Sequence, residues 1–257
     1  MSEYITTCER AARAGAEHLV RLRGRFEVRE KGPSDWVTEA DLASQEAIRK
    51  VVADAFPDHD FLGEEDPSAT RSGSRFAWHV DPLDGTTNYM HGAPPYCVSV
   101  ALAEDDEVVA AAIYDPWLDE CFTAQKGKGT FLDGTEISAS AAVSLGSSLV
   151  AASFPPVIDP DSDEIQAFLR VAQEVGSIRR TGSAALNLAY VAAGRFDGFW
   201  AVTIKPWDVA AGVLLVREAG GIVTAPDGGP FVLERASFAC AATEKLHGEL
   251  LHVLALG

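Results

Sequence analysis

An apolar run at residues 76–80 leads directly into Asp81-Pro82-Leu83-Asp84-Gly85, and this junction constrains the fold more than any other stretch. The run has the length of a buried strand, and Pro-Leu-Asp-Gly is typical of a sharp turn. Gly85 lets the backbone approach a ligand closely. We therefore expect Asp81 and Asp84 on one tight bend at the carboxyl end of a strand, where α/β sheets bind ligands.

Two carboxylates on so short a segment repel each other unless protons or cations intervene. Hard oxygen ligands of this kind suit Mg²⁺ or Mn²⁺ better than zinc. Taken alone, the segment is equally compatible with an ordinary Asp-Gly turn.

Two more acidic sites stand at the ends of regular elements. Glu64 and Glu65 follow the short apolar entry Phe61-Leu62-Gly63, and Asp208 lies at the start of an apolar helix. Together with Asp81 and Asp84 they could supply the ligands of a two-metal centre. Such centres hold their ions about 3.5–4 Å apart, activate a water and stabilise both oxygens of a phosphoryl displacement.

With these segments the sequence resembles a known family, the inositol monophosphatase-like, lithium-sensitive, Mg²⁺-dependent phosphatases. The matching segments occur in family order and span nearly the whole chain. They are Asp35-Trp36-Val37-Thr38-Glu39-Ala40-Asp41, Gly63-Glu64-Glu65, Asp81-Pro82-Leu83-Asp84-Gly85-Thr86-Thr87-Asn88, Arg179-Arg180-Thr181-Gly182-Ser183-Ala184-Ala185-Leu186-Asn187-Leu188 and Trp207-Asp208-Val209-Ala210-Ala211-Gly212.

The resemblance implies two or three Mg²⁺ ions, with Mn²⁺ as a possible substitute. One ion takes Glu64, Asp81 and the backbone carbonyl of Leu83, and a second takes Asp81, Asp84 and Asp208. A third, looser ion shares Glu64 and waters. Glu65 either binds a metal indirectly through water or contacts the residues that bind the metals. Lys31 matches a family lysine near the metals.

The resemblance also implies the catalytic groups. Glu64 and Thr86 orient the attacking water and accept its proton, and Asp41 hydrogen-bonds Thr86. Backbone N–H groups at a turn of this kind form a nest that favours a phosphate, and the N-terminus of the helix that follows Gly182 also favours anions. The expected substrate contacts are Asp84, Gly85, Thr86, Ser183, Ala184 and Asp208.

Ala201 departs from the family pattern. It stands seven residues before Asp208, where family members that act on inositol phosphate commonly carry a glutamate that holds a ring hydroxyl. Alanine cannot accept that hydrogen bond, whose loss costs about 1–3 kcal/mol. Inositol 1-phosphate remains the first substrate to consider; other polyol or sugar phosphates, fructose 1,6-bisphosphate, 3′-phosphoadenosine 5′-phosphate and histidinol phosphate are the alternatives.

Other activities fit parts of this pattern. An aspartyl-phosphate phosphatase also begins with Asp at a strand end, but it needs its second acid two residues on, and Asp84 is three residues after Asp81. Pro82 and the missing downstream ligands exclude an EF-hand. A metal-dependent binding or regulatory protein without turnover is the alternative of another class.

The chain of 257 residues has a net charge of −17, which argues against nucleic acid and anionic membranes as partners. Its four cysteines form no metal-binding spacing and are expected as buried thiols in a reducing cytosol. No segment has the length of a membrane span or the core of a signal peptide. We expect a cytoplasmic protein and, from the resemblance, a homodimer.

Periodicity and turn signals place the elements. In the first half we expect helices at 4–23 and 40–56, the second capped by Thr38, a hairpin at 26–38 and strands at 96–103, 107–114 and 119–123. Lys126-Gly127-Lys128-Gly129 lacks the spacing of a phosphate loop and is expected as a hairpin turn.

In the second half strands and helices alternate, which is α/β patterning. Strands are expected at 149–153, 177–180, 196–200, 221–224 and 237–242, and helices at 161–175, 183–193, 207–219 and 243–254. The implied fold is a layered α/β fold, an α+β sandwich of alternating helix pairs and β-sheets. We expect halves at 1–145 and 146–257 within one compact family domain.

Overall fold

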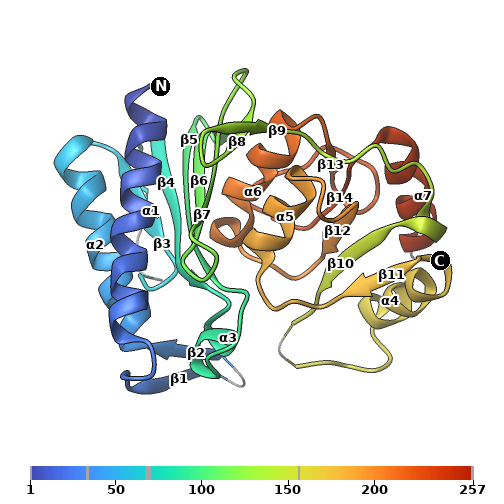
Figure 1. The fold of residues 1–257 in the computed structure, drawn as a ribbon, viewed down its shortest axis with the longest axis horizontal. Helices are drawn as coiled ribbons and strands as arrows, with labels where there is room; N and C mark the ends of the chain where they lie inside the picture. Colours follow the sequence, from blue (N-terminus) through green and yellow to red (C-terminus); the bar gives the residue numbers. More distant parts are fainter. Residues whose placement is uncertain (1, 33–34, 67–70, 156, 256–257) are drawn as a thin grey trace.

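A computed structural model describes residues 2–32, 35–66, 71–155 and 157–255 (Figure 1). Five layers follow one another across the molecule: a helix pair, a seven-stranded sheet, a second helix pair, a five-stranded sheet and a third helix pair. The expected alternation of helix pairs and sheets is therefore confirmed.

The first sheet has the order β3-β4-β5-β6-β7-β8-β9 and is antiparallel except for the parallel pair β3 and β4. Its strands are β3 (Asp60–Gly63), β4 (Phe76–Asp84), β5 (Cys97–Glu104), β6 (Glu107–Asp115), β7 (Glu120–Gln125), β8 (Thr130–Leu132) and β9 (Thr135–Ile137). The outer helices α1 (Glu3–Leu22) and α2 (Glu39–Ala55) cover one face, as Figure 1 shows.

Helix α2 begins where its cap predicts. Thr38 accepts a hydrogen bond from the backbone N–H of Ala40, and Asp41 accepts one in return from the backbone N–H of Thr38. Such a capping box satisfies two N–H groups that have no partner within the helix. Upstream, β1 (Val28–Gly32) and β2 (Asp35–Thr38) pair antiparallel as expected, although the predicted turn residues 33–34 lie outside the described residues.

The middle layer contains α5 (Ala184–Ala192) and α6 (Pro206–Glu218), which pack together between the two sheets. Every residue of α6 from Val209 to Val216 is buried. A helix that is apolar all round needs this kind of burial on both sides. Gly212 makes the contact possible, because a Cβ at this position would overlap the side chain of Leu188.

The second sheet has the order β11-β10-β12-β14-β13, with β10 parallel to both β11 and β12. Its strands are β10 (Leu149–Ser153), β11 (Ser177–Arg179), β12 (Gly198–Ala201), β13 (Ile222–Thr224) and β14 (Phe238–Ala241). The helices α4 (Asp163–Glu174) and α7 (Glu244–Leu254) pack on its outer face, and a short 3₁₀ helix, η1 (Leu145–Ser147), precedes β10.

Most elements of the second half lie within two residues of their expected bounds. The first half differs in several places, among them the strands β8 and β9, which were not expected. Residues 86–90 form a short helix, α3 (Thr86–Met90), where the sequence indicated only a turn. Strand β4 continues through Asp84 instead of ending before Asp81. One apolar core contains residues from both predicted halves, among them Phe122 and Leu186, and the division at residue 145 stays a prediction.

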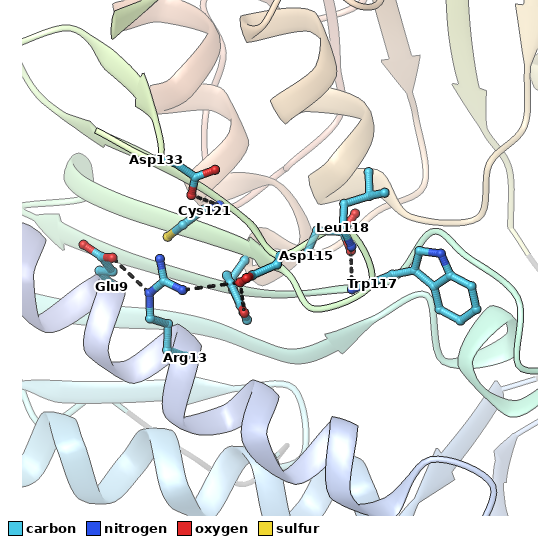
Figure 2. A network of polar contacts seen from close by, with 9 residues as sticks. Glu9, Arg13, Asp115, Trp117, Leu118, Cys121 and Asp133 are labelled. Carbon is cyan, nitrogen blue, oxygen red and sulfur yellow. Dashed lines mark hydrogen bonds and ion pairs between the residues drawn. The ribbon is translucent and has the colours of Figure 1, made fainter. Parts of the chain in front are cut away.

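Backbone and side-chain hydrogen bonds fix the turns on the α1 side of the first sheet (Figure 2). The carboxylate of Asp115 accepts the N–H groups of Trp117 and Leu118 at 2.8 and 3.2 Å, which closes the β6–β7 turn. Within α1, Nε of Arg13 donates a hydrogen bond to the carboxylate of Glu9 at 3.0 Å. All four cysteines are buried free thiols, as expected. Among the described residues, no helix combines the length and hydropathy needed to span a bilayer.

Candidate metal centre and active site

Three carboxylates from distant parts of the chain meet between the two sheets. Oxygens of Glu64, Asp81 and Asp208 all lie within 4.8 Å of one another. Glu64 follows β3, Asp81 belongs to the neighbouring β4, and Asp208 is the third residue of α6. The backbone N–H of Glu64 donates to the carbonyl of Val80 at 3.1 Å, which places Glu64 beside Asp81.

A bulge in β4 explains how Asp81 and Asp84 serve one site. Asp81 pairs with Ser99 and Asp84 with Cys97, so β4 contains one residue more than β5 over this interval. Side chains three residues apart on a regular strand point to opposite faces. The extra residue restores both aspartates to one face, and Pro82 lies within the bulge, where a missing N–H is tolerated.

Asp84 lies beside the three carboxylates but is anchored elsewhere. Its Oδ2 accepts the Ser183 hydroxyl at 2.6 Å and the backbone N–H of Ala185 at 2.7 Å, at the start of α5. Burial raises the pKa of Asp84 to about 6, although these hydrogen bonds favour the ionised form. Ser183 is fully buried beneath the site, so the structure places it against Asp84.

Burial and like charges raise the pKa of the other two aspartates. For Asp81 and Asp208 the largest cause is burial, followed by the negative charge of Glu64 and then by other site aspartates. In the described part of the chain, no lysine or arginine pairs with Asp81, Asp84 or Asp208. Clustered aspartates with no lysine or arginine paired to them in the described residues fit a divalent cation such as Mg²⁺.

Thr86 is connected to α2 through a chain of hydrogen bonds. Its hydroxyl lies 3.2 Å from Oδ1 of Asp41 and 3.0 Å from the carbonyl of Leu83, and it can donate to one of them at a time. The other oxygen of Asp41 accepts the hydroxyl of Thr38 at 2.5 Å. Burial raises the pKa of Asp41 to about 6. The expected Asp41–Thr86 contact is thus present.

The turn after β4 requires a glycine. Gly85 has a φ of +95°, and a Cβ there would lie 2.9 Å from the carbonyl oxygen of Pro95. Thr86 then starts α3. The first N–H groups of a helix have no acceptor within the helix, so the backbone at Gly85 and Thr86 presents donors next to the carboxylates.

A cavity of about 1230 Å³ opens over the carboxylates. Of the predicted site residues, Glu64, Asp84, Ala184 and Asp208 line it, as does Glu65. The remaining predicted residues are not among those that line it: Asp41, Asp81, Leu83, Gly85, Thr86 and Ser183. The side chain of Lys31 lies outside the described part of the chain. Ala201 is fully buried in the apolar core at the end of β12 and does not line the cavity either.

Three cations also line this cavity, and the sequence pattern indicated no role for them: Arg180, Lys205 and Arg235. Arg180 is part of a quoted family segment, whereas Lys205 and Arg235 lie on connections without a recognisable pattern. The one available signal was topological. Strands β10, β11 and β12 are parallel, and parallel strands in α/β sheets present their carboxyl ends to ligands.

The glycine-rich segment at residues 126–129 forms the hairpin turn between β7 and β8, as expected. Its backbone N–H groups do bind an anion, but the anion is the carboxylate of Glu218. The N–H groups of Gly127, Lys128 and Gly129 donate to Glu218 at 2.8, 3.0 and 2.9 Å. This nest is therefore occupied by the protein's own side chain.

The chain is similar to known proteins over most of its length. The model of the inositol monophosphatase family matches residues 1–255. An inositol-1-monophosphatase of Rhizobium meliloti is 44% identical over 82% of this chain and 79% of its own. A fructose-1,6-bisphosphatase/inositol-1-monophosphatase of Aquifex aeolicus is 38% identical over 98% and 96%. The crystal structure of extragenic suppressor protein suhB from Bartonella henselae has 38% identity and a TM-score of 0.94, with both chains covered completely.

Proposed function

The chain belongs to the inositol monophosphatase family of phosphatases, and from that premise we propose that it hydrolyses the phosphate monoester of a small polyol or sugar. Inositol 1-phosphate is the first substrate to test. The observation that carries the proposal is that oxygens of Glu64, Asp81 and Asp208 lie within 4.8 Å of one another, beside a cavity that Glu64 and Asp208 line. The homodimer and inhibition by lithium stay predictions from the family, and the cytoplasmic location stays a prediction from the sequence.

Four carboxylates and one carbonyl would hold Mg²⁺. Glu64, Asp81 and the carbonyl of Leu83 would take one ion, and Asp81, Asp84 and Asp208 a second. A third ion would share Glu64. When bound, Mg²⁺ supplies the Lewis acidity and the positive charge that phosphate ester hydrolysis needs. The free oxygen of Asp84 is the one available for this role, because Oδ2 is engaged by Ser183 and Ala185.

The side chains around the ions would position the other reactants. The Thr86 hydroxyl, held by Asp41, and the Glu64 carboxylate orient a water for in-line attack and accept its proton. Backbone N–H groups of Gly85, Thr86 and Ala184 donate to the phosphate oxygens, where the positive end of a helix also favours negative charge. In this scheme Ser183 acts through Asp84.

The substrate itself is the open part of the proposal. The relatives include proteins named for inositol 1-phosphate and for fructose 1,6-bisphosphate. Ala201 offers no acceptor for an inositol hydroxyl, because its side chain is a methyl group buried in the core. Other sugar or polyol phosphates, 3′-phosphoadenosine 5′-phosphate and histidinol phosphate therefore belong in the first substrate panel.

Phosphate release from this panel, with Mg²⁺ or with a chelator, tests the proposal. We expect release that requires Mg²⁺ and that is lost in Asp208→Asn. The control Asp54→Asn alters an exposed carboxylate paired with Lys50 on α2 and should keep full activity. Absence of release from every ester by the folded, Mg²⁺-loaded protein would leave only a binding protein. Trapping of a phosphorylated Asp81 would instead favour aspartyl-phosphate chemistry.

A further inference from the structure

The cavity over the carboxylates has a second, oppositely charged set of lining residues, which we call the cationic set: Arg180, Lys205 and Arg235. The chain has 21 lysines and arginines against 38 acidic residues, so cations are scarce. Three of them nonetheless line the same cavity as Glu64, Asp84 and Asp208.

The cationic set comes from one edge of the second sheet and from a nearby loop. Arg180 follows β11, Lys205 lies between β12 and α6, and Arg235 precedes β14. Because β11 and β12 both run parallel to β10, the first two residues follow carboxyl ends that share an edge. Three separate connections thus supply the three charges to one cavity.

The three cations have no carboxylate partner in the part of the chain that the structure describes. In the described chain, many other cations are paired with carboxylates, for example Arg13 with Glu9, Arg49 with Asp66, Arg71 with Asp106, Arg75 with Asp105 and Arg195 with Glu120. Among the described residues, no carboxylate forms an ion pair with a member of the cationic set. Arg180 instead lies over the ring of Phe154, with its guanidinium carbon 5.8 Å from the ring centroid.

The acidic residues do not need these cations either. Two divalent ions would already offset the four negative charges of Glu64, Asp81, Asp84 and Asp208. The metal centre could then bind one phosphate without the cationic set. The cavity, at about 1230 Å³, also exceeds the roughly 300–1,000 Å³ typical of small-molecule sites. Positive charge and space therefore remain after one phosphate and its metals are accommodated.

We propose that the preferred substrate carries a second anionic group, a phosphate or a carboxylate, which Arg180, Lys205 and Arg235 bind while the other phosphate is hydrolysed. The inference rests on the proposed phosphatase function and selects within it against neutral polyol monophosphates. Arginine and lysine suit this task because their N–H groups form charge-assisted hydrogen bonds with phosphate and carboxylate oxygens.

Matched substrate pairs test the inference. Fructose 1,6-bisphosphate is compared with fructose 1-phosphate for a second phosphate, and 3-phosphoglycerate with glycerol 3-phosphate for a carboxylate. We expect kcat/KM at least about tenfold higher for the doubly anionic member of one pair or both, which is the size of one or two charge-assisted hydrogen bonds. Which pair responds identifies the second anion.

Single variants assign the preference to the cationic set. Arg180→Gln, Lys205→Gln and Arg235→Gln should each reduce kcat/KM for the doubly anionic substrate about tenfold, and for its partner about twofold or less. The control Lys50→Gln makes the same change in net charge at an exposed residue of α2 and should alter neither value.

The inference would be overturned by equal kcat/KM for both members of both pairs. It would also be overturned if the variants lost kcat/KM equally for the doubly anionic substrate and for its partner. Either result would leave the phosphatase function intact. If no ester is hydrolysed, the proposed function fails, and calorimetry with Mg²⁺-loaded protein then decides the inference separately. Fructose 1,6-bisphosphate or 3-phosphoglycerate must in that case bind more tightly than its partner, and the triple variant must abolish the difference.

Discussion

The two charged sets that line the cavity are built in opposite ways. The carboxylates stand on β4, at the end of β3 and in the first turn of α6, and their positions are held by hydrogen bonds to Ser183, Ala185 and the backbone. The cations stand on connections, are exposed and form no ion pairs in the described chain. Groups that are partly or fully buried and held in place suit chemistry common to a family, whereas exposed groups on connections suit the recognition of a particular substrate.

The largest expected effect separates the two sets most sharply. Asp81→Asn should reduce kcat/KM by about 1,000-fold or more, equally for both members of each substrate pair, because it removes the carboxylate that we propose binds two metal ions. The metal-free variant should nevertheless melt at a higher temperature than the metal-free wild type, since one of several buried like charges is gone. Activity assays measure the loss of kcat/KM, and thermal unfolding with a chelator measures the melting temperature of the metal-free protein. A variant that retains activity, or that melts lower without metal, would contradict the assignment.

Metal removal and pH should act on the acidic set, which comprises Glu64, Asp81, Asp84 and Asp208, and on Asp41, but not on the cationic set. The pKa values of Asp41 and Asp84 are raised to about 6 from an unfolded value of 3.8. The folded state therefore binds protons more tightly, and the metal-free protein should lose stability as the pH rises from about 4 to about 6. Mg²⁺ at about 100 times its Kd should add ~2.7 kcal/mol per site above that range.

Thermal unfolding with and without Mg²⁺, at about pH 5 and about pH 7.5, measures this prediction. The stabilisation by Mg²⁺ should be larger at the higher pH, where the carboxylates are ionised. The variant Lys205→Gln, which belongs to the cationic set, serves as the control and should show the same Mg²⁺ dependence. Equal stabilisation at both pH values would contradict the role given to the carboxylates.

An intermediate effect is expected for the hydroxyl that α2 holds in place. Thr86→Val should lower kcat by about 100-fold with little change in KM, and Thr86→Ser should restore much of the loss. Asp41→Asn should also lower kcat. The double variant should lose less than the product of the two single losses, because both act through one hydrogen bond. Multiplicative losses in steady-state kinetics would contradict this coupling.

The smallest effect is expected where the acidic set is anchored. Ser183→Ala removes the 2.6 Å hydrogen bond to Asp84 and the cap of α5, and should lower the free energy of unfolding by about 1–3 kcal/mol. The preference between members of a substrate pair should not change, because the cationic set is untouched. Ser147→Ala, at an exposed hydroxyl, is the matched control. Chemical denaturation gives the stability, and a changed substrate preference would contradict the separation of the two sets.

The sequence was informative where local chemistry repeats a pattern. The Thr38 cap of α2 and the alternation of strands and helices after residue 148 were predicted within two residues. The acidic segments were recognised because Asp-Pro-Leu-Asp-Gly and Trp-Asp combine turn chemistry with carboxylates. The bulge in β4 was missed, since it is defined by pairing with β5, which lies outside the segment. Helix α3 was missed for a similar reason: five residues are too few for a periodic signal.

By itself, the sequence determined the composition of the site: which carboxylates exist, which elements present them and which family the chain resembles. Only the tertiary structure decided that Ser183 holds Asp84, that Glu218 fills the glycine-rich turn, and that Arg180, Lys205 and Arg235 share a cavity with the acidic residues. The physical reason is that these contacts join residues tens of positions apart or more. Such contacts depend on the packing of whole sheets and helices, which local propensity does not encode.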